Sequence, residues 1–394
     1  MVSVDDIYAA YRCAKKNKGR TADAIEYELH LESNLLRLVD DINNRTLQPT
    51  AYTFVATRPK PREIFATDMS TRIVHHYLDI RLRPLIEAEL TDRTYNNRIG
   101  FGPDNAFNQL VTDIYEVTEG HTRKAWAISA DISGYFPHAN QDVAFSQLKD
   151  LVMRKYHGDD RDDVLYMLRS CIFSYPCDHC TRKSPLHMWQ LIPEGKSLFR
   201  TEDGFGAAIG YLIWQNEMNY YLNDFDHFMT DTCGFHYLRF VDDMRWVIPD
   251  ENKDAFLAMF PMFREMLARK GCRFNEIKFE CQPAERGGVF IGRAYKGRRV
   301  YASTRIVRHF REQIKKIDGR ARQSKIDVTL SSLNSYTGIL KGTCGYNVIR
   351  KVGVLPDDWR KFLTFDKRRL CFVAKDKYSF RRRLARKYDL RLKK

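Results

Sequence analysis

The chain has 394 residues, a formal charge of +15, and 44% hydrophobic residues. This composition excludes an intrinsically disordered protein, and no apolar run approaches the ~20 residues that a membrane-spanning helix needs. The positive charge favours a polyanionic partner, first of all a nucleic acid, although a surface that is basic only for solubility has the same composition.

Nine cysteines are scattered without a regular spacing, which is typical of free thiols in a reducing compartment. The first residues lack the basic start and the apolar core of a signal peptide. We therefore expect a cytoplasmic protein with no membrane partner. Cys177 and Cys180, with Cys171 nearby, offer too few ligands for structural zinc, so an insertion loop with free thiols is the favoured interpretation.

Apolar residues among polar neighbours predict helices in the first part of the chain. They are Ile25, Leu29 and Leu36 within residues 1–50, and Ile73, Tyr77, Ile80 and Leu85 in a later stretch. Between these stretches, prolines alternate in residues 58–64, which forbids a helix and limits any strand to the edge of a sheet. The alternation places Arg58, Lys60 and Arg62 on one side of the extended backbone.

The middle of the chain has strand-like segments. They are residues 126–132, 235–241, 244–248 and 288–292. The second and third follow each other directly, so they form a hairpin with Asp242 and Asp243 at its tip. The fourth leads into another hairpin near Gly297. Helical stretches separate these strands and dominate the last hundred residues, which indicates an α+β fold.

Three carboxylates lie at the ends of these strands. Asp131 ends the first strand, and Asp242 and Asp243 lie on the hairpin turn. Phosphoryl transfer by two metal ions needs acidic side chains that converge on Mg²⁺ ions about 4 Å apart. An Asp-Asp pair at a turn is by itself more often plain turn chemistry. The apolar flanks of this pair, and Asp131 in a second buried strand, favour a shared metal site.

These residues resemble the catalytic boxes of reverse transcriptases. Phe240-Val241-Asp242-Asp243 resembles their Tyr/Phe-x-Asp-Asp box, and Asp131-Ile132-Ser133-Gly134-Tyr135-Phe136 resembles the preceding box of the bacterial, group II intron-like branch. Further similar boxes follow in the family's order: Arg62-Glu63-Ile64 with Asp68 and Arg72, Asn97 to Gly102, Lys196-Ser197-Leu198-Phe199, Ile209-Gly210 with Gln215, Lys278, Gly288 to Gly292, and Ser335 to Gly338. The set most resembles enzymes of diversity-generating retroelements, with retron and phage-defence enzymes next.

The resemblance implies a right-hand polymerase fold. N-terminal helices and fingers would occupy residues 1–124, and a palm with an antiparallel sheet would occupy 125–298. The palm would carry an insertion at about 171–205. A helical, basic thumb would follow at 299–394.

The resemblance also implies catalytic roles. Asp131, Asp242 and Asp243, with the backbone of Ile132, would hold two Mg²⁺ ions, for which Mn²⁺ is a possible substitute. Lys278 would act on the pyrophosphate leaving group as an acid or as a fixed charge. A solvated surface lysine is the alternative at that position.

Other residues would contact the nucleotide. The guanidinium groups of Arg62 and Arg98 suit triphosphate oxygens, and Phe136 occupies the position that excludes a ribose 2′ hydroxyl. The remaining nucleotide-binding positions are Tyr135, Ile209 and Gly210. Most reverse transcriptases have Gln where this chain has Ile209, and an apolar residue there goes with error-prone copying in the resembling enzymes. Trp214 replaces their usual Ser, and either crowds the primer or template or packs inside the palm.

Basic residues provide candidate contacts to nucleic acid. Lys60 lies on the extended stretch. The C-terminal tail adds a cluster among aromatic residues, namely Arg381, Arg382, Arg383, Arg386 and Lys387. Such a segment can grip duplex phosphates or structured RNA, although a merely solvated basic helix has the same composition.

The resulting hypothesis is an RNA-directed DNA polymerase that copies a dedicated structured non-coding RNA into cDNA. Its partners would be the template RNA, a DNA or RNA primer or the cDNA duplex, and dNTPs; participation of an accessory protein subunit is open. Two alternatives remain. One is a retron or phage-defence reverse transcriptase that makes protective DNA, with or without a template. The other is a non-catalytic RNA-binding scaffold.

Overall fold

The computed structural model describes the chain except for residues 17, 19–20, 58–59, 318–325 and 376–394. It combines helices with mainly antiparallel sheets, which confirms the α+β expectation. The chain divides into two compact units: Met1–Ala106 with Ile128–Cys281, and Phe107–Ala127 with Gln282–Lys394. No helix in the described part of the chain has the length and apolar character needed to cross a membrane.

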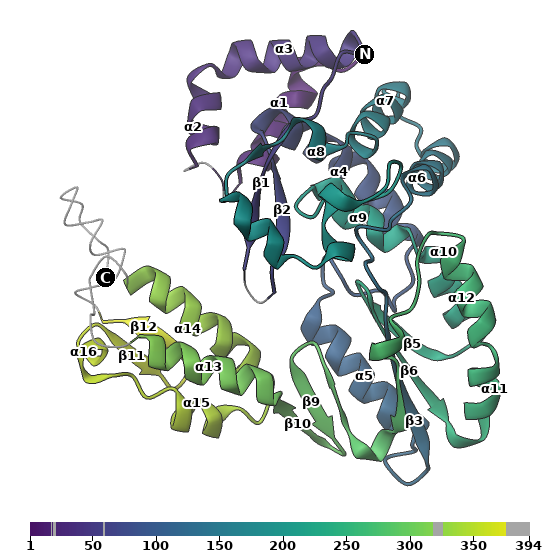
Figure 1. Cartoon of the computed structure of the whole chain (residues 1–394), viewed down its shortest axis with the longest axis vertical. Helices are drawn as coiled ribbons and strands as arrows, with labels where there is room; N and C mark the ends of the chain where they lie inside the picture. The colour runs from purple at the N-terminus through teal and green to yellow at the C-terminus, as the bar shows by residue number, and fades with distance from the viewer. Residues whose placement is uncertain (17, 19–20, 58–59, 318–325, 376–394) are drawn as a thin grey trace. The chain divides into compact units, whose positions relative to one another are not determined.

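Three helices begin the first unit (Figure 1): α1 (Val4–Lys15), α2 (Ala22–Leu29) and α3 (Leu31–Asn43). The helices were predicted, but the residues behind the prediction face solvent, because Ile25, Leu29 and Leu36 are all exposed. The buried face of α3 is a different one from that of Leu36. It has helical spacing and consists of Leu35, Leu38, Val39 and Ile42.

A small sheet follows, with the order β2-β1-β4. Its strands are β1 (Ala51–Ala56), β2 (Arg62–Thr67) and β4 (Thr181–Arg182). β2 lies at the edge, as the prolines before it predict. The next helix, α4 (Met69–Glu89), begins after Asp68, whose carboxylate accepts a hydrogen bond from the amide of Thr71. Ile73 and Tyr77 are buried in α4 as expected, whereas Ile80 is exposed.

The sheet that carries the three carboxylates has the strand order β5-β6-β3-β7. Its strands are β3 (Ala125–Asp131), β5 (His236–Phe240), β6 (Asp243–Pro249) and β7 (Glu280–Pro283). β5 and β6 form the predicted antiparallel hairpin. Beside it lie α10 (Asn223–His227), α11 (Lys253–Ala258) and α12 (Phe260–Ala268), as Figure 1 shows.

Aromatic side chains fill the space between this hairpin and its helices. Trp246 of β6 is fully buried and contacts Phe256 and Phe260, with ring centroids 5.8 and 6.3 Å away. Phe263 of α12 joins the same cluster. Each such burial contributes roughly 1.5–3 kcal/mol, so this core holds the hairpin rigidly in place.

The other helices of the first unit are α6 (Gln141–Lys155), α7 (Arg161–Ile172), α8 (Pro176–His179) and α9 (Leu212–Tyr220). Trp214 is buried on α9, so of the two interpretations of this residue the packing one is confirmed. Short helical turns and β4 occupy the expected insertion between α7 and α9. All nine cysteines are free thiols, as expected.

The second unit contains most of α5 (Pro103–Val117) and a three-stranded sheet of β8 (Gly288–Phe290), β9 (Arg293–Lys296) and β10 (Arg299–Ala302). The hairpin near Gly297 is confirmed. Then follow α13 (Thr304–Lys316), α14 (Ile326–Lys341), α15 (Tyr346–Val352), α16 (Asp357–Arg360), β11 (Leu363–Asp366) and β12 (Cys371–Ala374). The β11–β12 hairpin was not expected. It packs on the helices through Phe372, in a core with Phe310, Leu333 and Trp359.

Candidate active site

The turn between β5 and β6 is tight. Phe240 pairs with Asp243, so only Val241 and Asp242 form the loop, and Asp243 is already the first residue of β6. Val241 has a φ of +61°, a conformation that a β-branched residue rarely adopts. Strain of this kind costs of order 1–3 kcal/mol and persists only where the surrounding structure enforces it.

Backbone hydrogen bonds bring Asp131 to the same place. The amide of Ile132 donates to the carbonyl of Asp242 at 3.1 Å, which ties the end of β3 to the turn. On the other side, the amide of Asn275 donates to the carbonyl of Asp131 at 2.7 Å. The three predicted carboxylates therefore lie at one edge of one sheet, although 111 positions of sequence separate Asp131 from Asp242.

Two basic side chains lie at this edge. Lys278 donates to Asp131 Oδ2 at 2.6 Å, and the guanidinium of Arg245 lies 3.8 Å from an oxygen of Asp243. Burial, followed by the negative charges of Asp243 and Asp131, raises the pKa of Asp242 to about 6. Lys278 was expected either at the leaving group or on the open surface, and it lies at the carboxylates with its side chain 45% exposed.

This donor set fits a hard divalent cation. Carboxylate oxygens are the ligands that Mg²⁺ prefers, and the repulsion felt by Asp242 is what a bound cation would relieve. The oxygens of the three carboxylates do not all lie within 4.8 Å of one another. The cysteines form no comparable cluster of three ligands among the side chains that the structure describes.

Two of the predicted nucleotide-binding residues line one narrow pocket. Phe136 and Ile209 line it, together with Lys196 and the buried carboxylate of Glu63. Glu63 accepts hydrogen bonds from the hydroxyl of Ser197 and the amide of Leu198, which fastens β2 to the insertion. Sequence reasoning named Ile209 and Phe136 but gave Glu63 no role.

Gly210 lies directly against β2. The carbonyl of Ile209 accepts a hydrogen bond from the amide of Phe65 at 2.8 Å. Gly210 has a φ of +115°, and a Cβ there would lie 2.3 Å from the carbonyl oxygen of Phe65. Only glycine therefore fits at this position.

Two predicted contacts to the nucleotide are engaged elsewhere. Arg98 is buried: it forms an ion pair with Glu87, donates to the carbonyls of Thr91 and Thr94, and stacks on Phe101. These bonds engage Nε and Nη1 of its guanidinium, so Arg98 braces its own loop in this structure. Tyr135 is also in the core, where its hydroxyl donates to the carbonyl of Met218.

The remaining basic candidates are on the surface or beyond the described residues. Arg62 and Lys60 are both exposed, at and just before the start of β2. Arg62 thus remains available to an anionic ligand. The predicted tail cluster of Arg381, Arg382, Arg383, Arg386 and Lys387 lies outside the described residues.

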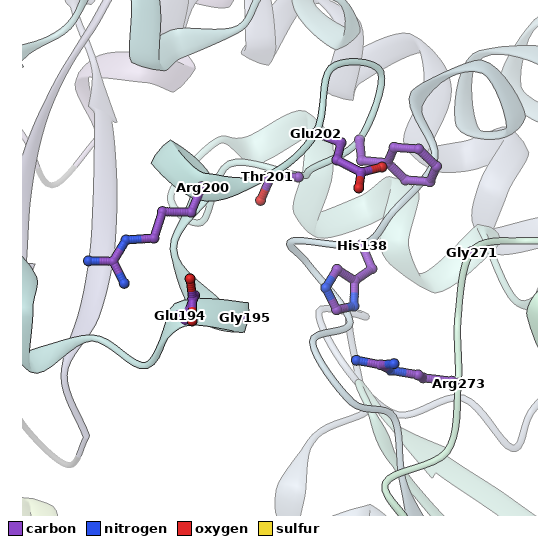
Figure 2. A pocket seen from close by; sticks show the side chains of 9 residues that line it. His138, Glu194, Gly195, Arg200, Thr201, Glu202, Gly271 and Arg273 are labelled. Carbon is purple, nitrogen blue, oxygen red and sulfur yellow. The ribbon is translucent and has the colours of Figure 1, made fainter.

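A larger cavity of about 400 Å³ adjoins the end of β3. The amide of Ser133 donates to the carbonyl of Arg273, which lines this cavity. Figure 2 shows His138 and Arg273 on one wall, with Glu194 and Arg200 across the opening. The sequence pattern did not single out these residues. Because carboxylates and guanidinium groups both line the cavity, its charge alone does not select an anion.

Comparison with known proteins gives distant likenesses. No family model matches the chain, and no curated protein sequence matches it. Among solved structures, the chain is similar to telomerase from Candida albicans in complex with a fragment of telomeric RNA, with 12% identity, a TM-score of 0.46, and 84% of this chain and 60% of that chain covered.

Two structures of apo telomerase from Candida tropicalis are also similar. One gives 11% identity, a TM-score of 0.47, and 77% and 57% coverage of the two chains. The other, truncated from the C-terminal domain, gives 11% identity, a TM-score of 0.44, and 64% and 55% coverage. The chain thus spans little more than half the length of these proteins. At such scores, the likenesses establish neither its fold nor its activity.

The raised pKa of Asp242 predicts a gain in stability when its charge is removed. In metal-free protein, Asp242→Asn should raise the free energy of unfolding by about 1–3 kcal/mol at pH 7. Since the pKa is 3.8 in the unfolded chain and about 6 in the fold, the gain should grow between these values as the pH rises and vanish below pH 4. Denaturant unfolding in EDTA at several pH values measures it.

Asp160 supplies the matched control. It accepts hydrogen bonds from Tyr77, Tyr156 and Arg81, and these bonds lower its pKa despite burial. Asp160→Asn should therefore destabilise the protein at pH 7. A loss of stability in Asp242→Asn as well, at every pH, would contradict the account of the carboxylate cluster.

Proposed function

We propose that this chain is a reverse transcriptase that copies a structured RNA into DNA by two-metal nucleotidyl transfer. The observation that carries the proposal is the meeting of Asp131, Asp242 and Asp243 at one edge of an antiparallel sheet. Lys278 lies at the same edge, and Phe136 and Ile209 line one pocket. The formal charge of +15 favours a nucleic acid as the partner.

In this proposal the fold is a right-hand polymerase. The β1–β2 sheet belongs to the fingers, the sheet of β5, β6, β3 and β7 to the palm, and α13 to α16 to the thumb. The two compact units divide the chain differently: residues 1–106 group with 128–281, so the proposed fingers and most of the palm share one unit, whereas residues 107–127 and 282–298 group with the proposed thumb.

The proposed chemistry assigns each charged residue a task. Bound Mg²⁺ would lower the pKa of the primer 3′ hydroxyl and neutralise charge on the triphosphate. Asp131, Asp242 and Asp243 would supply its ligands, with the backbone of Ile132 as a further oxygen donor. Lys278 keeps a positive charge beside Asp131, where it would stabilise the leaving pyrophosphate.

The pocket would select the sugar and the base pair. Phe136 would exclude a ribose 2′ hydroxyl by its bulk, and Gly210 would let the chain pass close to β2. Ile209 presents an apolar side chain in the same pocket. We propose that it grips the base pair loosely, so that copying is error-prone, as in diversity-generating retroelements. Arg62 would contact the triphosphate from the exposed start of β2.

Primer extension with purified protein tests this proposal. The wild-type chain should extend a DNA primer on an RNA template with dNTPs and Mg²⁺, whereas Asp242→Ala/Asp243→Ala should lose at least about 10³-fold in rate. Asp254→Ala is the matched control, because Asp254 is almost fully exposed on α11. Equal rates in all three proteins would reveal a contaminating polymerase. No extension by the wild type on RNA or DNA templates would contradict the proposal.

Phe136 provides a test of sugar selection. Phe136→Val should raise the use of ribonucleotides relative to deoxynucleotides by about 10- to 100-fold, because a smaller side chain leaves room for the 2′ hydroxyl. Phe136→Tyr keeps the bulk and should keep the preference. Competition assays that measure kcat/KM for both nucleotides give the ratio, and an unchanged ratio in Phe136→Val would remove Phe136 from this role.

A further inference from the structure

An arginine and an aspartate are buried together beneath the carboxylate turn. Arg239 of β5 and Asp226 of α10 form an ion pair in which both side chains are 0% exposed. The Arg239 Nε lies 2.9 and 3.1 Å from the two oxygens of Asp226, and Nη2 also donates to this carboxylate. Such a pair is costly to bury unless its remaining hydrogen-bonding groups are also satisfied.

The remaining acceptor capacity of Asp226 is used. The hydroxyl of Tyr237 donates to one oxygen at 2.7 Å, and the hydroxyl of Thr94 donates to the other at 2.9 Å. Asp226 therefore accepts from three separate side chains, which fix its orientation. In turn, it fixes the plane of the Arg239 guanidinium.

The rest of the guanidinium binds backbone. Nη1 donates to the carbonyl of Val241 at 3.1 Å, and Nη2 donates to the carbonyl of Asn219 on α9 at 2.8 Å. Val241 is the strained residue with φ of +61°, and its carbonyl begins the peptide that leads into Asp242. The buried pair thus holds the turn from below, while the amide of Ile132 holds the carbonyl of Asp242 from β3.

We propose that Arg239 and Asp226 are positioning residues that hold the strained turn so that Asp242 stays next to Asp131. This inference rests on the proposed polymerase function. Arginine is required because one planar fork must reach Asp226, Val241 and Asn219 together, whereas a lysine ammonium reaches fewer acceptors. A pair that only stabilised the core could be replaced by apolar residues without loss of activity, since such replacements are often neutral for stability.

The decisive variant is Arg239→Met/Asp226→Leu, which removes both charges and leaves no buried ion unpaired. Its melting temperature should fall, because the hydroxyls of Tyr237 and Thr94 lose their acceptor and the carbonyls of Val241 and Asn219 lose their donor, but at the assay temperature the protein should remain folded. On primer–template its kcat should fall about 100-fold with the KM for dNTP changed by less than threefold, because misplacement of a reacting group by about 1 Å has an effect of this size. Arg239→Lys keeps a charge for Asp226 and should show the same fall in kcat.

Two readouts do not depend on activity. Hydrogen exchange of the Ile132 amide, which is bonded to Asp242, should become at least tenfold faster in both variants while β5 stays protected. Affinity for Mn²⁺, followed by electron paramagnetic resonance, should fall about tenfold. The control is Arg81→Met/Asp160→Leu, which removes a partly exposed Arg–Asp pair that joins α4 to the start of α7. It should change none of the three readouts at the carboxylates.

The outcomes separate this inference from the proposed function. Wild-type protein without polymerase activity would overturn the proposed function. Hydrogen exchange of the Ile132 amide and Mn²⁺ affinity in the variants would then still show whether Arg239 and Asp226 position the turn. Unchanged kcat, exchange and Mn²⁺ affinity in folded Arg239→Lys would overturn the positioning role while the function stands. If the double variant fails to fold, Arg239→Lys alone gives this decision.

Discussion

Like charges repel, and the first unit is built so that three carboxylates remain close to one another. Burial, followed by the charges of Asp243 and Asp131, raises the pKa of Asp242, and Val241 at the turn has a left-handed conformation. The opposing stability comes from the aromatic core behind the β5–β6 hairpin, where Trp246 and its neighbours are buried. Backbone bonds from Ile132 and Asn275 then fix the end of β3 beside the turn. A site under such strain is expected where binding of a cation is the compensating interaction.

Hydrogen bonds of β2 hold the segments that line the pocket of Phe136 and Ile209. β2 fixes both of the chain segments that approach it: Glu63 holds the insertion at Ser197, and the amide of Phe65 holds Ile209. Gly210 allows the close approach because it has no side chain. Residues about 145 positions apart along the chain therefore line one wall of one pocket, next to Phe136.

Much of this arrangement could be predicted from sequence because it depends on local patterns. An apolar run predicts a buried strand, two such runs joined by a short turn predict a hairpin, and alternating prolines predict an edge strand. For this reason β3, the β5–β6 hairpin and the edge position of β2 were expected. The convergence of Asp131 with the turn also followed from resemblance to known boxes. The exposed faces of α2 and α3 were misjudged, because Ile25 and Leu36 have helical spacing but no element in the described part of the chain covers them.

The partners of buried charged side chains could not be predicted from the sequence, because these pairs join residues that are distant along the chain or carry no local pattern. An arginine beside a glycine-rich loop, such as Arg98, is typical of a phosphate-binding residue. Only the fold reveals that its guanidinium bonds to Glu87 and to two backbone carbonyls. Arg239 was visible as a charge inside an apolar strand, which is a signal that a buried partner must exist. Its partner, Asp226, is on a helix 13 residues earlier, where no pattern marks it.

The central claim is that this chain makes DNA from an RNA template, and the nucleic acids bound to the protein in its native host test it most directly. Purified wild-type protein should carry an RNA together with DNA complementary to it, and the Asp242→Ala/Asp243→Ala protein should carry the RNA alone. Mismatches concentrated at one template base would support diversification, whereas accurate or repetitive DNA would point to a defence role. RNA without new DNA in both proteins would contradict the claim and leave an RNA-binding scaffold as the better account.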